Sequence, residues 1–111
     1  MAGEYAEGVE STDALLRRAI AEKRLIEFRY KGKVRVVEPH DYGVHNGEVK
    51  LFGYQVGGES SQKLPNWRWG VVGEMSEVKV LEQKFAGGRG AASGKHHTWE
   101  KVFARVAKPE E

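Results

Sequence analysis

Residues 38–42 of this 111-residue chain, Glu-Pro-His-Asp-Tyr, bring two carboxyl groups, an imidazole and a phenol close together. Such groups serve general acid–base catalysis when they converge on one cleft. On an extended segment adjacent side chains point to opposite sides, so His40 and Tyr42 could share a face that excludes Asp41. Two interpretations stay open. Either Glu38 and His40 satisfy buried backbone groups while Tyr42 packs on the core, or this run forms a wall of a ligand-binding cleft.

The sequence Trp67-Arg68-Trp69 is the second candidate, because two indole rings and a guanidinium follow a polar loop. Small β-barrels hold single-stranded nucleic acid by stacking bases on aromatic rings and pairing phosphates with cations. The competing interpretation is that Trp67 and Trp69 fill the inside of a barrel and leave Arg68 in solvent. An exposed pair of tryptophans would equally suit a protein partner or a homodimer contact.

Arg89, in the run Phe-Ala-Gly-Gly-Arg, is the third candidate. Its guanidinium could fold back across the domain and pair with Glu38, or it could bind an anion. Arg35, Lys50 and Arg89 would extend a positive surface around the tryptophan loop.

Other chemistries lack the residues they need. The chain has no cysteine, which excludes disulfides and thiolate sites. The four histidines, residues 40, 45, 96 and 97, do not have the spacing of a metal site. The glycine-rich run at 86–95 lacks the Gly-Lys-Ser/Thr order of a phosphate loop. We therefore predict no metal, no cofactor and no enzymatic activity.

The composition is that of one globular domain. Hydrophobic residues make up 40% of the chain and charged residues 31%, with a net charge of +2 that permits nucleic-acid binding without arguing for it. No apolar run reaches the roughly 20 residues that a membrane span needs. The acidic N-terminus lacks a signal-peptide pattern, so we expect a cytoplasmic protein without membrane contact.

One helix precedes the strands. Residues 12–23 place Leu15, Leu16, Ala19 and Ile20 on one helical stripe, with Thr12 or Asp13 as the N-cap. From residue 25 the apolar period changes to two, which predicts a strand over 25–30 with alternate side chains buried.

Turn residues then separate further short strands. Asn46-Gly47 suits a type I′ hairpin turn. Pro39 is expected to end its strand or to lie on an edge, and Gly53 to mark a bulge or a corner. Segments 67–72 and 77–85 are further strand candidates, whereas 98–107 fits either a helix or a strand.

These elements predict a mainly β (α+β) domain, in which an N-terminal helix is followed by a small five-stranded antiparallel barrel. Residues 1–11 are expected to form a flexible leader and residues 12–85 the barrel domain. Residues 86–111 would form a glycine-rich connector and a C-terminal segment packed on the barrel.

The order of motifs resembles the WYL domain family. The run LLRRAIAEKRLIEFRYKGKVRVVEPHDYG, the later GYQVGG, and the closing SEVKVLEQKF occur in family order, over about residues 14–89. The chain carries Val49-Lys50-Leu51 where the family has its Trp-Tyr-Leu tripeptide, and Glu74 where an arginine is usual. The DNA-binding helix pair that often precedes the domain is not expected in the short leader.

The resemblance implies an Sm- or SH3-like barrel that senses a ligand in bacterial transcription regulation. We therefore expect a non-enzymatic module that binds nucleic acid or a nucleotide. The alternative is an interaction or homodimerisation module that uses the Trp67/Trp69 loop. The expected binding residues are His40, Tyr42, Tyr54, Gln55, Trp67, Arg68, Arg35 and Arg89.

Overall fold

The structure, a computed structural model, describes residues 11–89 and 99–109. Within these residues helix α2 (Thr12–Glu22) comes first and is followed by six strands and one short 3-10 helix. The strands are β1 (Arg24–Tyr30), β2 (Lys33–His45), β3 (Glu48–Gly58), β4 (Asn66–Val71), β5 (Ser76–Lys84) and β6 (Lys101–Arg105), and the 3-10 helix η1 (Val72–Glu74) joins β4 to β5.

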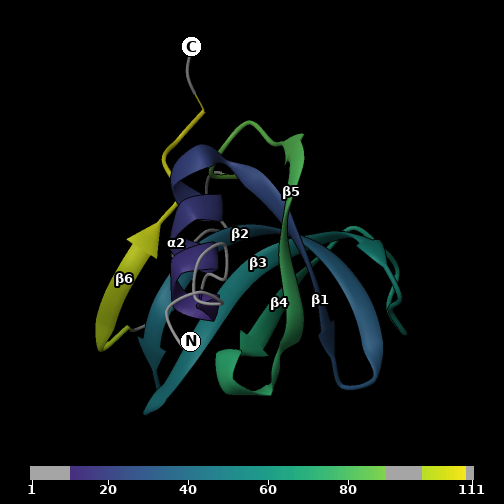
Figure 1. Cartoon of the computed structure of the whole chain (residues 1–111), viewed down its shortest axis with the longest axis horizontal. Coiled ribbons are helices and arrows are strands. Elements are labelled where there is room, and N and C mark those ends of the chain that lie inside the picture. The colour runs from purple at the N-terminus through teal and green to yellow at the C-terminus, as the bar shows by residue number, and fades with distance from the viewer. Residues whose placement is uncertain (1–10, 90–98, 110–111) are drawn as a thin grey trace, which may run out of the picture.

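These six strands pair antiparallel in one strongly curved sheet, in which five follow the order β4-β3-β2-β1-β5 and β6 pairs with β2 (Figure 1). Strand β2 is long enough to pair with β1 along its first half and with β6 along its second half. Among the described residues no pairing joins β4 to β5, so the sheet is open. A mainly β domain with one N-terminal helix is therefore confirmed, and closure into a barrel is not.

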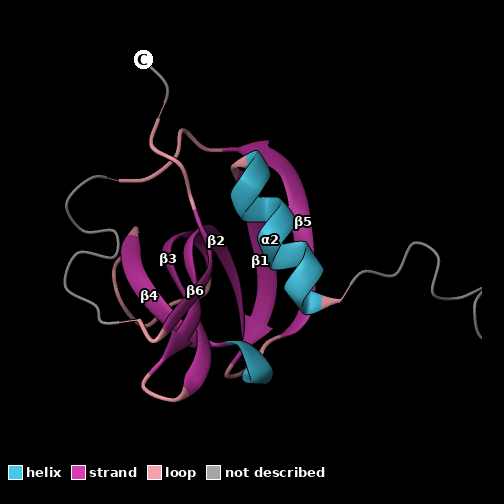
Figure 2. Cartoon of the chain, turned by 90° about the vertical axis from the view of Figure 1, so that its left-hand side faces the viewer, coloured by secondary structure: helices cyan, strands magenta, loops and turns pink. Residues whose placement is uncertain are grey.

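Helix α2 packs on the sheet near β1 and β5 (Figure 2). Ser11 is its N-cap, because the Ser11 Oγ accepts a hydrogen bond of 3.1 Å from the Ala14 N–H. The prediction of Thr12 or Asp13 as the cap was wrong by one or two residues. Asp13 instead accepts a hydrogen bond from the Tyr42 hydroxyl. No helix in the described part of the chain is long and apolar enough to span a membrane.

The core lies between the helix and the concave side of the sheet. The predicted helical stripe and the predicted alternation of β1 both contribute to it, and Leu15 is the one stripe residue that is only half-buried. The buried core residues are Leu16, Ala19, Ile20, Ile26, Phe28, Tyr30, Val37, Tyr42, Leu51 and Val106.

The turns between β1 and β2 and between β2 and β3 have the same backbone geometry. Asn46 and Gly47 have φ values of 52° and 77°, and Lys31 and Gly32 have 53° and 77°. Two successive positive φ angles are characteristic of a type I′ turn, which matches the twist of the strands it joins.

Pro39 neither ends a strand nor lies at the edge of the sheet. It is buried inside β2, opposite Gly53 of β3. Its other side faces the gap between the last residue of β2 that pairs with β1, Val37, and the first that pairs with β6, Asp41. A proline is tolerated there because no neighbouring strand needs its missing N–H.

The C-terminal segment forms a strand, which decides between the two structures that the sequence allowed. Strand β6 pairs with β2, and the Val106 N–H donates to the His40 carbonyl oxygen at 2.8 Å. Val106 then enters the core. The expected leader at residues 1–11 lies almost wholly outside the described residues, as does most of the glycine-rich connector.

Candidate functional site

The alternation of strand β4 separates the two residue types that the sequence suggested would act together. Arg68 is opposite Gly53, whereas Trp67 is opposite Tyr54 and Trp69 is opposite Phe52. Arg68 therefore lies on the concave side of the sheet, and the two indoles lie on the convex side. The interpretation in which the tryptophans fill the inside and leave Arg68 in solvent is contradicted, because Arg68 lines the cavity on the concave side.

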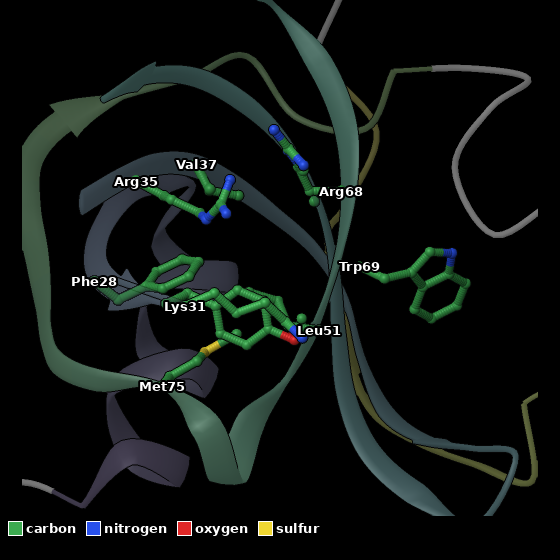
Figure 3. A pocket seen from close by; sticks show the side chains of 11 residues that line it. Phe28, Lys31, Arg35, Val37, Leu51, Arg68, Trp69 and Met75 are labelled. Atoms are coloured by element: carbon green, nitrogen blue, oxygen red, sulfur yellow. The ribbon is translucent and has the colours of Figure 1, made fainter. Parts of the chain in front are cut away.

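A cavity of about 170 Å³ lies on the concave side, and Arg68 projects toward it while the ring of Trp69 points away (Figure 3). Its lining is aromatic and aliphatic apart from Lys31, Arg35 and Arg68. No carboxylate of the described residues lines it. The lining residues are Phe28, Tyr30, Lys31, Arg35, Val37, Leu51, Gly53, Arg68, Trp69, Gly70 and Met75.

Two guanidinium groups in this cavity share one acceptor. The Arg35 Nη1 donates to the Gln55 Oε1 at 3.2 Å, and the Arg68 Nε donates to the same oxygen at 2.8 Å. Arg35 is only 7% exposed, and its Nε is a buried donor without a hydrogen-bond partner. A buried cation paired with a neutral amide retains its charge, so this end of the cavity is electropositive.

Burial and the neighbouring charge of Arg68 both disfavour the protonated form of Arg35. Burial lowers the pKa of the Arg35 guanidinium, and the charge of Arg68 lowers it further. Tyr30 and Glu59 act in the opposite direction. The Glu59 carboxylate also accepts a hydrogen bond of 3.0 Å from the Val34 N–H. An arginine still remains protonated near neutral pH. Arg35 and Arg68 are therefore both cationic, and no carboxylate of the described residues forms an ion pair with either.

The convex side of the sheet carries a continuous aromatic cluster, the outer aromatic cluster, which consists of Phe52, Tyr54, Trp67 and Trp69. The rings of Phe52 and Trp67 stack with a centroid distance of 4.9 Å. Trp69 packs against Trp99, 5.5 Å between centroids. The indoles are half-buried by these contacts, so much of their surface is used within the chain.

Arg89 reaches the edge of this cluster and takes the first of the two roles expected for it. Its guanidinium pairs with both oxygens of Glu38, at 2.7 and 2.8 Å, and lies over the Tyr54 ring. Arg89 therefore does not contribute to the cavity that contains Arg35 and Arg68.

His40 and Tyr42 do not share a binding face. The ladder between β2 and β3 shifts register between Pro39 and Asp41, which makes His40 the extra residue of a bulge. The His40 ring is fully buried against Trp67 and Phe85. The Tyr42 hydroxyl instead donates to Asp13 at 2.6 Å. An extra residue cancels the two-residue alternation from which the shared face was expected.

The eight expected binding residues thus fall into three places. Arg35, Gln55 and Arg68 meet at the cavity; Tyr54, Trp67, Arg89 and His40 meet around the outer aromatic cluster; Tyr42 lies under the helix.

Sequence reasoning assigned no binding role to the aromatic and aliphatic lining of the cavity, although its alternation put Phe28 and Tyr30 on a buried face. Ser60, whose hydroxyl accepts a hydrogen bond from Arg68, was also missed. Nothing in a serine-containing loop signals that contact. Within residues 11–89 and 99–109 there is no group of three or more potential metal ligands.

Comparisons of the chain with protein-family models, with curated proteins and with solved structures give no match. The geometry of the cavity and of the outer aromatic cluster is therefore the basis for a functional conclusion.

Proposed function

We propose that the chain is a non-enzymatic binding module whose cavity takes the anionic group of a small ligand, with a nucleotide-type phosphate as the favoured class. The observation that carries the proposal is the convergence of Arg35 and Arg68 on the single oxygen Gln55 Oε1. A sensing role in regulation is the accompanying proposal, from the resemblance to WYL domains.

An anion would supply what the cavity lacks. The Gln55 amide is neutral, so it satisfies donors without offsetting charge. Guanidinium groups bind phosphate and carboxylate through paired, charge-assisted hydrogen bonds. A ligand oxygen near Gln55 could accept from the unpartnered Arg35 Nε and from the remaining donors of Arg68.

The size of the cavity sets which part of a nucleotide enters. Its volume of about 170 Å³ is below the roughly 300–1,000 Å³ of pockets that enclose drug-sized ligands. We therefore place the phosphate between the arginines and the base outside, near the exposed Lys31 at the rim. A 5′-phosphorylated end of a single-stranded nucleic acid presents the same group.

The strand order supports a further proposal about architecture, that the domain is an open variant of the Sm- or SH3-like barrel. In the order β4-β3-β2-β1-β5 the fifth strand pairs with the first, as in such barrels. The short helix η1 connects β4 to β5. The alternative function as an interaction or homodimerisation module stays a prediction, and its surface would be the outer aromatic cluster.

Calorimetric titration at low salt tests the function. AMP, pyrophosphate and a short oligonucleotide with or without a 5′-phosphate are the ligands. Replacing Arg68 by Gln should weaken AMP and pyrophosphate binding by about tenfold or more, because charge-assisted hydrogen bonds are lost.

Arg29→Gln is the matched control, since Arg29 is an exposed cation of β1 that pairs with Glu77 and does not line the cavity. If the parent binds none of these ligands, or if both variants bind equally well, the proposal is rejected. Binding of the phosphorylated oligonucleotide alone would identify nucleic-acid ends as the ligand.

A further inference from the structure

The loop of residues 59–65, between β3 and β4, is attached to the same arginine and glutamine that form the cationic end of the cavity. The Arg68 Nη2 donates to the Ser60 Oγ. The Gln55 Nε2 donates to the carbonyl oxygens of Gly57, at 2.9 Å, and of Glu59, at 3.0 Å. The side chains that would bind an anion therefore also hold the start of this loop.

The start of the loop, at Glu59, is held more firmly than the residues that follow Ser60. Glu59 is fixed by its backbone, because its N–H donates to the Val34 carbonyl oxygen at 2.7 Å. Beyond Ser60 the loop is held by hydrogen bonds that involve side chains. The Gln62 N–H donates to the Ser60 Oγ at 3.0 Å, and Asn66 donates to the Gln62 side chain at 3.2 Å.

Ser60 thus links the loop to the cavity, since its hydroxyl oxygen accepts hydrogen bonds from both the Arg68 side chain and the Gln62 backbone N–H. Residues 61–63 are exposed and belong to no strand. Segments with few buried contacts open at a low free-energy cost. Loss of the contact between Ser60 and Arg68 should therefore release residues 60–63 without disturbing the sheet.

We infer that the loop of residues 59–65 responds to ligand binding, because an incoming anion displaces the Ser60 hydroxyl from Arg68. This inference rests on the proposed function. A charged oxygen is a stronger hydrogen-bond acceptor for a guanidinium than a neutral hydroxyl is, because it adds an ion pair to the hydrogen bond. Binding is then an exchange, in which Arg68 leaves Ser60 for the ligand and the loop opens.

This exchange gives the module an output. An occupied cavity differs from an empty one in the accessibility of the loop, which a partner protein can recognise. It also makes Ser60 a competitor of the ligand, so removing its hydroxyl should strengthen anion binding. If the hydroxyl instead contacted the ligand, its removal would weaken anion binding.

Hydrogen exchange of the full chain, with pyrophosphate as the probe, tests the release of the loop. Saturating pyrophosphate should speed amide exchange in residues 60–63 severalfold and leave β1 unchanged. Ser60→Ala should show fast loop exchange without pyrophosphate and should bind pyrophosphate about fivefold more tightly, the equivalent of one competing hydrogen bond. Ser60→Thr keeps a hydroxyl and should restore both properties of the parent.

The outcomes separate the two proposals. If calorimetry shows binding but amide exchange in the loop is unchanged or slower, the release of the loop is rejected and the binding function is retained. Weaker binding by Ser60→Ala would also reject the release of the loop, because Ser60 would then be a ligand contact. If the parent protein does not bind pyrophosphate, both the binding function and the release of the loop are rejected.

Discussion

Arg89 and Glu38 lie 51 residues apart and form an ion pair with two hydrogen bonds, Nε to Oε1 at 2.7 Å and Nη2 to Oε2 at 2.8 Å. Glu38 is 5% exposed, so water cannot solvate its carboxylate. These hydrogen bonds are the largest of the influences that raise the pKa of the Arg89 guanidinium. The pair fixes the segment after β5 to the middle of β2, beside the outer aromatic cluster.

Replacing Arg89 by Gln should lower the free energy of unfolding by about 1–3 kcal/mol, because the buried Glu38 carboxylate loses its counter-ion. The value is at the low end for a buried pair since the Arg89 side chain is itself 46% exposed. Urea unfolding of the full chain measures this change.

Two further variants make that result specific. Arg29→Gln removes an exposed cation whose nearest carboxylate is 3.8 Å away, and it should change stability by less than about 0.5 kcal/mol. Adding Glu38→Gln to Arg89→Gln should recover part of the loss, because a neutral amide is less costly to bury. Equal stability of the Arg89 and Arg29 variants would show that the pair contributes nothing.

Local sequence signals predicted the parts of the fold that depend on local physics. Asn46-Gly47 specified a turn because few other residues accept two successive positive φ angles. The alternation of Ile26, Phe28 and Tyr30 specified a buried face because strands have a two-residue period. Arg35, Gln55 and Arg68 were all among the expected binding residues, but nothing local showed that they would meet.

The errors came from features that depend on partners far along the chain. Pro39 continues β2 only because β1 ends its pairing before it and β6 begins after it. The bulge at His40 changes which residues share a face. For β4, alternation separated Arg68 from the tryptophans, but which side faced the core depended on the register with β3.

The buried imidazole of His40 should make stability depend on pH. Burial lowers its pKa below the ordinary 6.5, although the nearby Glu38 and Asp41 raise it and Arg89 lowers it. The unfolded chain therefore binds a proton at a higher pH than the folded one does. The free energy of unfolding should be highest above about pH 6.5 and should fall as the pH is lowered toward the folded pKa.

Urea unfolding at about pH 7.5 and about pH 5.5 measures this dependence, in a range where most carboxylates stay ionised. The His40→Gln variant removes the titrating group. Its stability should change less between the two pH values than that of the parent, even if it is lower at both. An identical pH dependence in the two proteins would show that His40 is not the group responsible.

Gly43 lies where the backbone of β6 leaves no room for a side chain on β2. A Cβ atom there would lie 2.0 Å from the Lys101 carbonyl oxygen and 2.9 Å from the Val102 Cα, both backbone atoms that cannot rotate away. Gly43→Ala should therefore push β6 from the sheet. We expect a loss of about 1–3 kcal/mol, as for other overpacked sites, together with faster amide exchange in residues 101–105 than in β1.

Gly73→Ala is the matched control, because a Cβ atom on Gly73 would meet nothing within 4 Å. It should stay within about 0.5 kcal/mol of the parent. The comparison tests the pairing of β6 itself, since an alanine at residue 43 is harmful only if the Lys101 backbone lies against it. If Gly43→Ala is as stable as Gly73→Ala and exchanges as slowly in residues 101–105, then β6 does not pair with β2 in solution, and the Val106 side chain must leave the core with it.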